Sequence, residues 1–315
     1  MSIIVGSFNM HKFSTNTYKD LECIGNMIKK NDIDILAIQE IFSQAALNTL
    51  LRVLGANWDG RWESPQSRSV SVAEGYAFLW NKNRISLSHR QSGECFEPVI
   101  HKQYPHKDFG SLIRDPFYGR FELKSNKMTE IRLINTHIMY SLNRSINESD
   151  DHDSSDRLPG EVMMRKKEFE ILATKILPKI DDKDYDIFWK EVDGICRRPI
   201  TILLGDYNLN LKESGAKDTF IDHPIIVIKD GNSEKRIVTI QKELTTLKAN
   251  LSKADTEGGY SNNFDHFTFD NNRPVDVTCW VVDAPNDPSL FAGDYEEYKK
   301  NVSDHLMIVM KLDLI

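Results

Sequence analysis

Residues 200–208 read Ile200-Thr201-Ile202-Leu203-Leu204-Gly205-Asp206-Tyr207-Asn208, a mostly apolar run that ends in a glycine, a carboxylate and a carboxamide. The run predicts a buried β-strand, and Gly205 allows the chain to turn sharply at its end. Asp206 and Asn208, two residues apart, then face the same cleft, where they can bind a metal ion, orient a water molecule and donate to a phosphoryl oxygen. The alternative is a plain turn, since Asp and Asn are common turn residues.

Five other segments end a hydrophobic run with a carboxylate, an amide or an imidazole. They are Ser7-Phe8-Asn9, Ile38-Gln39-Glu40, Ile134-Asn135-Thr136-His137, Asn263-Phe264-Asp265-His266 and Ser303-Asp304-His305. Polar groups at the ends of buried strands stand on a rigid scaffold beside an open cleft. Because hard metal ions and phosphate chemistry use these residue types, the six segments together predict one active site assembled from distant parts of the chain.

Two of these segments suggest a metal ligand and a proton-transfer group. Glu40 follows a strand predicted at 33–38, and a carboxylate there suits Mg²⁺, which takes few protein oxygens; the alternative is an acid at the start of the next helix. His137 ends an apolar run, where a lone histidine is often structural. Glu74, just before the strand predicted at 76–80, is its candidate partner, because a carboxylate on the second ring nitrogen fixes the tautomer.

The dipeptide Asp304-His305 lies just before the apolar run 306–310. At a corner between loop and strand both side chains can reach the cleft. We therefore expect His305, oriented by Asp265, to act as a general base for water, and Asp304 to be a further metal or histidine ligand. The alternative for this dipeptide is an exposed turn.

Arg114 precedes Asp115-Pro116, and a guanidinium next to a proline-fixed bend can bind a phosphate through two hydrogen bonds. The alternative is a surface ion pair between Arg114 and Asp115. The segment 101–107 mixes basic residues with a tyrosine and can touch a polyphosphate backbone, although such a stretch is also typical of a solvated loop.

The composition indicates one large globular domain over residues 1–315. The chain has 40% hydrophobic and 28% charged residues, without an internal repeat or a linker. An insertion is expected around 143–198, and it includes the acidic run 147–156, a predicted surface loop. The net charge of −7 argues against a protein held on nucleic acid by bulk charge alone. It does not exclude a nucleic-acid enzyme, because bound cations cancel metal-site carboxylates.

The cysteines and the N-terminus indicate a reducing compartment. Four widely spaced cysteines form no Cys-x-x-Cys motif, so a zinc or redox motif is absent, and two disulfide bonds are an alternative only for an exported chain. The N-terminus enters a strand at once, without a basic and then apolar leader. Since no apolar stretch reaches the ~18 residues that span a membrane, we expect a soluble cytoplasmic protein without a membrane span.

Hydrophobic periodicity predicts strands and helices along the whole chain. Helices are predicted at 18–30, 44–54 and 161–177, a partly helical insertion at 181–198 and a loop at 57–71. Two antiparallel pairs are predicted, 76–80 with 85–88 and 113–123 with 130–137. Further strands are predicted at 3–8, 33–38, 200–204, 264–269, 275–282 and 306–312. Hairpins beside β-α-β units predict an α/β (α+β) fold with two packed sheets and outer helices.

The set of strand ends resembles the endonuclease/exonuclease/phosphatase superfamily, which includes DNase I. The resemblance covers nearly the whole chain, and its specific elements are the segments at 7–9, 38–40, 205–208 and 303–305. It implies a four-layer sandwich of two mixed sheets flanked by helices, and divalent-metal-dependent cleavage of phosphate esters. Two features are closest to the DNase I-like branch: Ile113-Arg114-Asp115-Pro116-Phe117 and Glu74-Gly75-Tyr76.

The resemblance also implies roles for single residues. Glu74 goes with His137, and Asp265 goes with His305, as catalytic pairs. The substrate phosphate is bound by Arg114, Asn208 and Asn9. The metal ion, Mg²⁺ or Mn²⁺, is bound by Glu40, Asn9, Asp206 and Asp304. Asp206 and Asn208 belong to the catalytic set as well, and Ca²⁺ is a further candidate as a structural ion.

Three features depart from the DNase I-like pattern. Ile41-Phe42-Ser43 follows Glu40, where DNase I-type enzymes have an arginine that grips the DNA minor groove. Their threonine upstream of the orienting aspartate is not matched near Tyr260-Ser261, and their secretory signal and disulfide spacing are absent. The catalytic machinery therefore transfers better than the preference for DNA.

The expected function is that of a Mg²⁺-dependent phosphodiesterase, a DNase I-like endonuclease that hydrolyses DNA with little sequence specificity. The alternatives are a phosphatase or phospholipase of the same superfamily (phosphoinositide, sphingomyelin or nucleotide substrate), an abasic-site endonuclease, and an inactive binding module. Inositol 5-phosphatases usually show Trp-Cys-Asp-Arg where this chain has Asn263-Phe264-Asp265-His266. Inactive superfamily members usually lose ligands, whereas the full set is present here.

Overall fold

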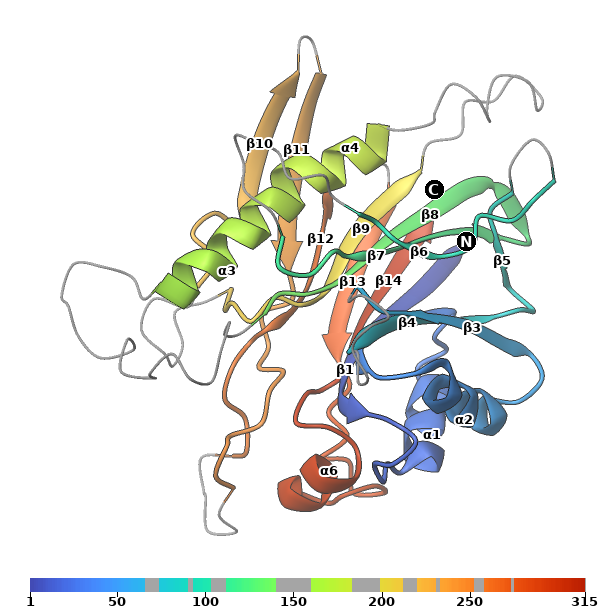
Figure 1. Cartoon of the computed structure of the whole chain (residues 1–315), viewed down its shortest axis with the longest axis vertical. Helices are drawn as coiled ribbons and strands as arrows, with labels where there is room; N and C mark the ends of the chain where they lie inside the picture. The colour runs from blue at the N-terminus through green and yellow to red at the C-terminus, as the bar shows by residue number, and fades with distance from the viewer. Residues whose placement is uncertain are drawn as a thin grey trace.

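Two β-sheets packed face to face form the centre of the computed structural model (Figure 1). The structure describes residues 1–65, 74–89, 93–102, 112–139, 160–182, 199–211, 220–230, 233–251, 258–272 and 275–314. The first sheet has the strand order β13-β14-β1-β2-β4-β3. Its strands are β1 (Ser2–Phe13), β2 (Ile35–Ile41), β3 (Trp58–Glu63), β4 (Gly75–Asn81), β13 (Val275–Val281) and β14 (Ile308–Leu314).

The second sheet has the order β10-β11-β12-β9-β8-β7-β5, with β6 paired to β7. Its strands are β5 (Ile85–Leu87), β6 (Val99–Ile100), β7 (Phe117–Leu123), β8 (Asn126–His137), β9 (Ile200–Asp206), β10 (Ile225–Asp230), β11 (Ser233–Ile240) and β12 (Asp265–Asp270). Each sheet contains one parallel pair, β1 with β2 and β8 with β9, among antiparallel neighbours. Both sheets are therefore mixed, as predicted.

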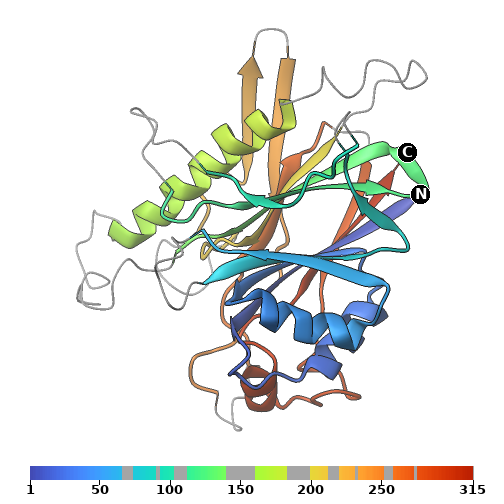
Figure 2. The same ribbon diagram turned by 45° about the vertical axis from the view of Figure 1, so that its right-hand side comes forward.

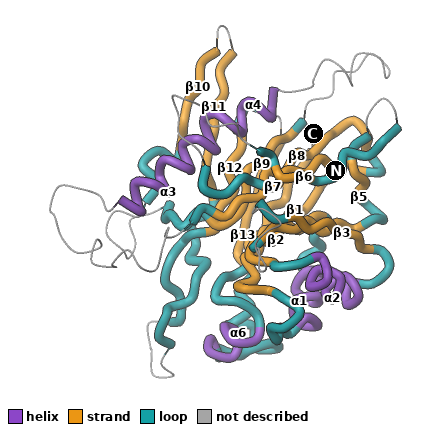
Figure 3. The backbone as a smooth tube through the Cα atoms, viewed as in Figure 1, coloured by secondary structure: helices purple, strands orange, loops and turns teal. Residues whose placement is uncertain are grey.

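Helices cover the outer faces of both sheets (Figure 2). α1 (Leu21–Lys30), α2 (Gln44–Leu54) and α6 (Tyr295–Asn301) pack on the first sheet. α3 (Gly160–Ile171) continues through the π-helical turn η2 (Leu172–Ile176) into α4 (Leu177–Asp182), and this long helix covers the second sheet. The predicted four-layer sandwich is thus confirmed, and Figure 3 shows the helices lying outside the strands.

Three apolar layers hold the four layers of secondary structure together. The layer between the sheets contains Val5, Phe78, Leu133, Ile202 and Met310. The layer under α1 and α2 contains Phe8, Ile24, Leu36 and Leu50. The layer under α3 and α4 contains Ile134, Phe169, Leu172 and Leu203. Strand side chains alternate between two of these layers, as the period of two in a β-strand requires.

Two of the predicted elements were wrong. Residues 57–71 were predicted as a loop, but β3 is an edge strand that pairs only with β4, and it is mostly half-exposed, so its apolar signal is weak. Residues 76–88 were predicted as a hairpin, but β4 pairs with β2 and β3 in the first sheet, and β5 pairs with β7 in the second. The turn after β4 therefore carries the chain from one sheet to the other.

Most other predicted elements are present, but β1 continues past the predicted end at residue 8 to Phe13, and β10 and β11 lie in a polar region where no strand was predicted. β7 and β8 form the predicted antiparallel pair, and α2 spans the predicted range 44–54. Of the expected insertion around 143–198, the structure describes the helix from α3 to α4; the acidic run 147–156 and residues 183–198 lie outside the described residues. In the described part of the chain, no helix combines the length and the apolar character that crossing a membrane requires.

Candidate active site

The strand faces that pack between the two sheets are apolar along most of their length and become polar near one end of the strands. On β9, Ile202 and Leu204 pack between the sheets, and Asp206 is the next residue on this face. The alternation of strand side chains places three other predicted site residues on the same inner faces: Asn9 on β1, His137 on β8 and Asp265 on β12. The pattern that builds the core therefore also gathers the site.

The register of the second sheet brings three of these residues side by side. Asp206 is paired with His137 across the parallel neighbour β8 and with Asp265 across the antiparallel neighbour β12. Gly205, the residue before Asp206, has a φ of +140°, and a Cβ atom there would lie 1.9 Å from the carbonyl oxygen of Thr136. Only glycine allows this close approach of β9 to β8.

Asp206 is the centre of the site. Its Oδ2 accepts a hydrogen bond from Asn9 Nδ2 at 3.0 Å and lies 3.6 Å from His137 Nε2 and 3.5 Å from His305 Nε2. Its Oδ1 accepts from the backbone N–H of Asn208 at 2.8 Å. Burial raises the pKa of Asp206, although the two histidines act in the opposite direction.

Each of the two histidines is held by its own carboxylate. His137 Nδ1 lies 2.7 Å from Glu74 Oε1, and His305 Nδ1 lies 2.9 Å from Asp265 Oδ2. Burial opposes the charged form of both rings, but Glu74 raises the pKa of His137, and Asp265 together with Asp206 raises the pKa of His305 well above its usual value. With Nδ1 occupied, both rings present Nε2 to the centre.

Arg114 lies beside the first of these pairs. Its Nη1 and Nη2 donate to the two oxygens of Glu74 at 2.6 and 2.8 Å, and Nη1 lies 2.8 Å from His137 Nδ1. Arg114 therefore shares a carboxylate with His137. Its Nε is buried and has no hydrogen-bond partner among the described residues, whereas the side chain as a whole keeps 13% of its surface exposed.

Glu40 stands on the other side of Asp206, bridged to it by Asn9. Asn9 Nδ2 donates to Glu40 Oε1 at 3.1 Å as well as to Asp206. A register shift in β2 and a φ of +55° turn Glu40 off the line of the strand. Burial raises its pKa, but His137, the Asn9 amide and His305 together hold the pKa of Glu40 below its usual value.

The last two predicted residues have partners of their own. Asn208 has a φ of +50°, and its side-chain amide donates to the carbonyl oxygen of Ile138 at 2.8 Å. Asp304 Oδ1 lies 3.0 Å from His11 Nδ1, and His11, although it also lies beside Asn9, was not among the predicted residues. The position of His11 in the sequence, two residues after the predicted site residue Asn9, could have identified it as a site candidate.

The donor set of this centre fits a divalent cation. Asp206, Asp265 and His305 each offer one ligand atom within 4.8 Å of the others. Asp265 Oδ2 and His305 Nδ1 contact each other at 2.9 Å, so Asp206 is the member of this group that is left to hold an ion. Glu40, joined to Asp206 by Asn9, adds a second carboxylate, the kind of ligand that Mg²⁺ prefers.

A residue outside the predicted set positions Asp265. The hydroxyl of Thr245 accepts from the backbone N–H groups of Phe264 and Asp265 at 3.0 and 3.2 Å. The DNase I-like pattern predicts such a threonine near Tyr260-Ser261. Thr245 lies further upstream, in a polar segment with little hydrophobic periodicity. The basic segment 101–107 is described only at His101 and Lys102, and the rest of it lies outside the described residues.

Comparison with known proteins gives a result through structure alone. No protein-family profile matches the sequence, and no curated protein matches it. An endonuclease/exonuclease/phosphatase family protein from Bacteroides thetaiotaomicron has a TM-score of 0.55 at 14% identity, over 100% of this chain and 99% of that chain. A mannosyl-6-phosphatase from the same species has a TM-score of 0.55 at 13% identity, over 99% and 100% of the two chains.

A third structure agrees with these two. Truncated TDP2 from Caenorhabditis elegans has a TM-score of 0.53 at 13% identity, and the match covers 100% of this chain and 98% of that chain. These matches run from end to end, so they include both sheets and the strand ends that carry the site. The chain therefore has the fold of the endonuclease/exonuclease/phosphatase proteins.

Proposed function

We propose that this chain is a divalent-metal-dependent phosphoric ester hydrolase, and that its substrate is the phosphodiester backbone of DNA, cut internally with little sequence specificity. One observation carries the proposal: two imidazoles, each fixed by a carboxylate, aim Nε2 at one buried carboxylate. Hydrolysis of a phosphodiester needs a proton acceptor for water and a proton donor for the leaving oxygen, and this geometry offers one group for each.

His305 is assigned as the base and His137 as the acid. Asp265 is fully buried and lies 2.9 Å from His305 Nδ1, so it stabilises the imidazolium that forms when His305 takes a proton from water. Because Asp265 and Asp206 also raise the pKa of His305, the ring is neutral and able to accept that proton only where the pH lies above this raised pKa, or where a bound cation would offset the charge of Asp206. Glu74 is shared between His137 and Arg114, so it supports the charge of that ring less strongly. His137 is then the better donor to the leaving 3′ oxygen.

Arg114 and Asn208 are assigned to the phosphate. The side chain of Arg114 is 13% exposed beside His137, and a guanidinium stabilises the extra negative charge of a pentavalent phosphorus. Asn208 stands on the left-handed turn after Asp206, with its amide near Ile138. Asn9 is assigned to the phosphate as well, and this role requires its NH₂ group to leave Glu40 or Asp206, because both of its N–H bonds donate to these carboxylates.

Glu40 and Asp206, with Asn9 and Asp304 nearby, are the residues assigned to Mg²⁺ or Mn²⁺. When bound, such an ion polarises the phosphate and offsets developing negative charge. Asn9 keeps the carboxylates of Glu40 and Asp206 together through two hydrogen bonds of 3.1 and 3.0 Å.

The choice of DNA rests on Arg114-Asp115-Pro116 and Glu74-Gly75-Tyr76, which resemble the DNase I-like branch. Ile41 weighs against tight DNA binding, because an arginine is expected there in that branch. Proteins with this fold act on different esters: besides the mannosyl-6-phosphatase, ANGEL2 is described as a 2′,3′-cyclic phosphatase. A phosphatase is therefore the second candidate.

The test is a nicking assay on supercoiled plasmid with Mg²⁺ or EDTA, comparing wild type with His137→Ala. We expect nicking by wild type with Mg²⁺, none with EDTA, and a loss of about 100-fold or more in His137→Ala. His223→Ala, an exposed histidine outside the site, is the matched control and keeps full activity.

The substrate panel separates the alternatives. An abasic duplex, a phosphoinositide, a sugar phosphate and a nucleotide are incubated in parallel with the plasmid. Cleavage of the abasic duplex alone supports an abasic-site endonuclease, and release of phosphate from a monoester alone supports a phosphatase. Absence of cleavage in every reaction overturns the proposal and favours a binding module.

A further inference from the structure

Helix α3 carries two charged side chains on its buried face. Arg165 and Glu168 are 2% and 4% exposed, although neighbouring buried positions of the helix are apolar: Val162, Phe169 and Leu172. Residues three apart lie on the same helix face. Burial of charged groups costs free energy, and apolar residues of similar volume stabilise a core at least as well. The two charges therefore point to a role other than stability.

Arg165 reaches the turn after Asp206. Its Nη1 donates to the carbonyl oxygen of Asn208 at 3.1 Å. Asn208 is a non-glycine residue with a φ of +50°, a conformation that needs support from its surroundings. The N–H of Asn208 in turn donates to Asp206 Oδ1 at 2.8 Å, whereas Oδ2 accepts from Asn9 and faces the two histidines. Arg165 is thus connected to the central carboxylate through one residue.

Glu168 contacts two further backbone segments of the site. Its Oε1 accepts from the backbone N–H of Ile113 at 2.5 Å, directly before Arg114. Glu168 also accepts from the backbone of Met139 and interacts electrostatically with Arg114 and His137. A buried carboxylate that holds two backbone N–H groups fixes the segments on both sides of it.

We propose that α3 is the positioning element of this site: Arg165 holds the Asn208 turn and Asp206, and Glu168 holds the segment that presents Arg114. The effect on turnover rests on the proposed function, whereas the effect on the two backbone segments does not. Within the part of the chain that the structure describes, Arg165 and Glu168 hold backbone groups beside the site, so both are positioning residues. Arg165 and Glu168 lie on a helix and far along the chain from the strand ends. A search for polar residues at strand ends therefore does not find them.

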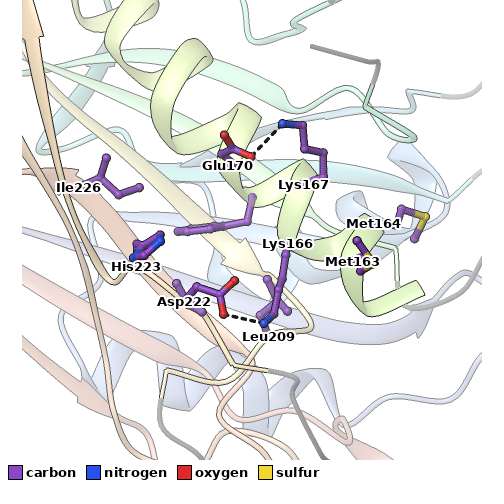
Figure 4. Close-up of a pocket in the computed structure, with 11 residues that line it drawn as sticks. Met163, Met164, Lys166, Lys167, Glu170, Leu209, Asp222, His223 and Ile226 are labelled. Atoms are coloured by element: carbon purple, nitrogen blue, oxygen red, sulfur yellow. Dashed lines mark hydrogen bonds and ion pairs between the residues drawn. The ribbon is translucent and has the colours of Figure 1, made fainter. Parts of the chain in front are cut away.

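The outer side of α3 offers matched controls. Figure 4 shows Lys167 paired with Glu170, and Lys166 paired with Asp222, around a groove between α3 and residues 221–226. Lys167 and Glu170 have side chains that are 53% and 57% exposed. Lys167→Met and Glu170→Leu therefore remove the same charges from the same helix without touching the site.

The first experiment measures kcat and KM on the cleaved ester. Arg165→Met is expected to lower kcat by roughly 10- to 100-fold with a smaller change in KM, because it loosens Asp206. Glu168→Leu is expected to raise KM more than it lowers kcat, because Arg114 binds the phosphate. Arg165→Lys and Glu168→Gln, which keep a donor and an acceptor, recover part of the loss. If Arg165→Met does not fold, Arg165→Gln replaces it in the same comparison.

The second experiment follows amide hydrogen exchange at Ile113 and Asn208 in protein without substrate. Exchange at Ile113 is expected to rise about tenfold in Glu168→Leu but not in Glu168→Gln or Glu170→Leu. Exchange at Asn208 is expected to rise in Arg165→Met but not in Lys167→Met. A wild type that cleaves no ester overturns the proposed function and leaves this experiment decisive for α3. Unchanged exchange, or equal losses of activity in the Lys167 and Glu170 controls, overturns the inference about α3.

Discussion

His137 and His305 direct their Nε2 atoms at the same oxygen, Asp206 Oδ2, from 3.6 and 3.5 Å. Each ring is held at Nδ1 by a different carboxylate, Glu74 or Asp265, so neither ring is free to turn away. Three interacting ionisable groups titrate as one set. Under the proposed function, this arrangement would let the centre accept a proton at one imidazole and release one from the other without a large rearrangement.

Asp206→Asn tests whether this shared carboxylate matters for turnover. The substitution keeps the shape of the side chain and removes the charge that both imidazoles face, so we expect kcat to fall by about 100-fold or more. Far-UV circular dichroism is expected to stay unchanged. Asp222→Asn, at an acid that pairs with Lys166 outside the site, serves as control. Near-wild-type activity of Asp206→Asn would falsify the role given to Asp206.

Glu74 and His137 are expected to act as a unit. The structure joins them by a 2.7 Å contact at His137 Nδ1, and the loss of either partner disables the same proton transfer. We therefore expect Glu74→Gln and His137→Ala each to lower kcat strongly, and the double variant to be little worse than His137→Ala alone. Glu63, at the end of the edge strand β3, gives the comparison: Glu63→Gln combined with His137→Ala adds no loss. Additive losses in the first cycle contradict the pairing.

The positions of the site residues at the strand ends could be predicted from the sequence, because the same alternation of inward and outward side chains places the core residues and the site residues. Ile202, Leu204 and Asp206 follow each other at intervals of two, so the apolar pattern that predicts β9 also fixes the direction of Asp206. The motif after Gly205 and the order of the other strand ends then carry the resemblance to the superfamily. Fold and central residues could be inferred from such local patterns.

The supporting residues could not be found in this way, because their contacts depend on tertiary structure. Thr245 reaches Asp265 from a segment with few apolar residues, and Arg165 reaches Asn208 from a helix that packs across the sheet. The misassigned hairpin at 76–88 has the same cause: closeness in sequence does not say which sheet a strand joins. In the sequence, Arg165 and Glu168 stand out only as charged residues on the apolar face of the helix predicted at 161–177.

Binding of a divalent cation is expected to stabilise the protein through Glu40 and Asp206. A ligand that binds only the folded state contributes about 2.7 kcal/mol at a hundredfold excess over its Kd. We expect Mg²⁺ to raise the Tm of wild type relative to EDTA. Glu40→Gln is expected to lose most of this shift while keeping its Tm in EDTA, because a neutral amide still accepts from Asn9. Calorimetry gives the Mg²⁺-dependent rise in Tm, with Glu63→Gln as the control variant. If Glu40→Gln shows the same rise as wild type, the ion binds elsewhere.

Lys19 makes stability depend on alkaline pH. Burial lowers its pKa to about 8 from the usual 10.5, although Asp304 and Glu40 act in the opposite direction. Between pH 8 and 10.5 the unfolded chain then binds more protons at this residue than the folded chain, so the contribution of Lys19 to stability rises with pH. Below pH 8 its destabilising effect is complete.

The comparison that isolates Lys19 uses Lys19→Met and Lys30→Met, the second at a mostly exposed lysine. Urea unfolding at pH 7, 9 and 10 gives the difference in free energy between each variant and wild type. Relative to wild type, the unfolding free energy of Lys19→Met is expected to be highest at pH 7 and to fall towards pH 10, as the buried lysine of the wild type loses its charge. Lys30→Met is expected to show no such trend. A constant difference for Lys19→Met across this range rules out the lowered pKa.

Gly205→Ala tests the close approach that seats Asp206. Gly205 has a φ of +140°, and a Cβ atom would lie 1.9 Å from the carbonyl oxygen of Thr136, its partner on β8. Backbone cannot give way there without separating β8 from β9, so we expect a loss of unfolding free energy above roughly 4 kcal/mol. Gly55 has a φ of +96° and a ψ of −179° with no atom within 4 Å of an added Cβ, and Gly55→Ala should cost only about 1–3 kcal/mol of backbone strain. Equal losses in urea unfolding would mean that positive φ alone, and not contact with Thr136, makes glycine necessary at the end of β9.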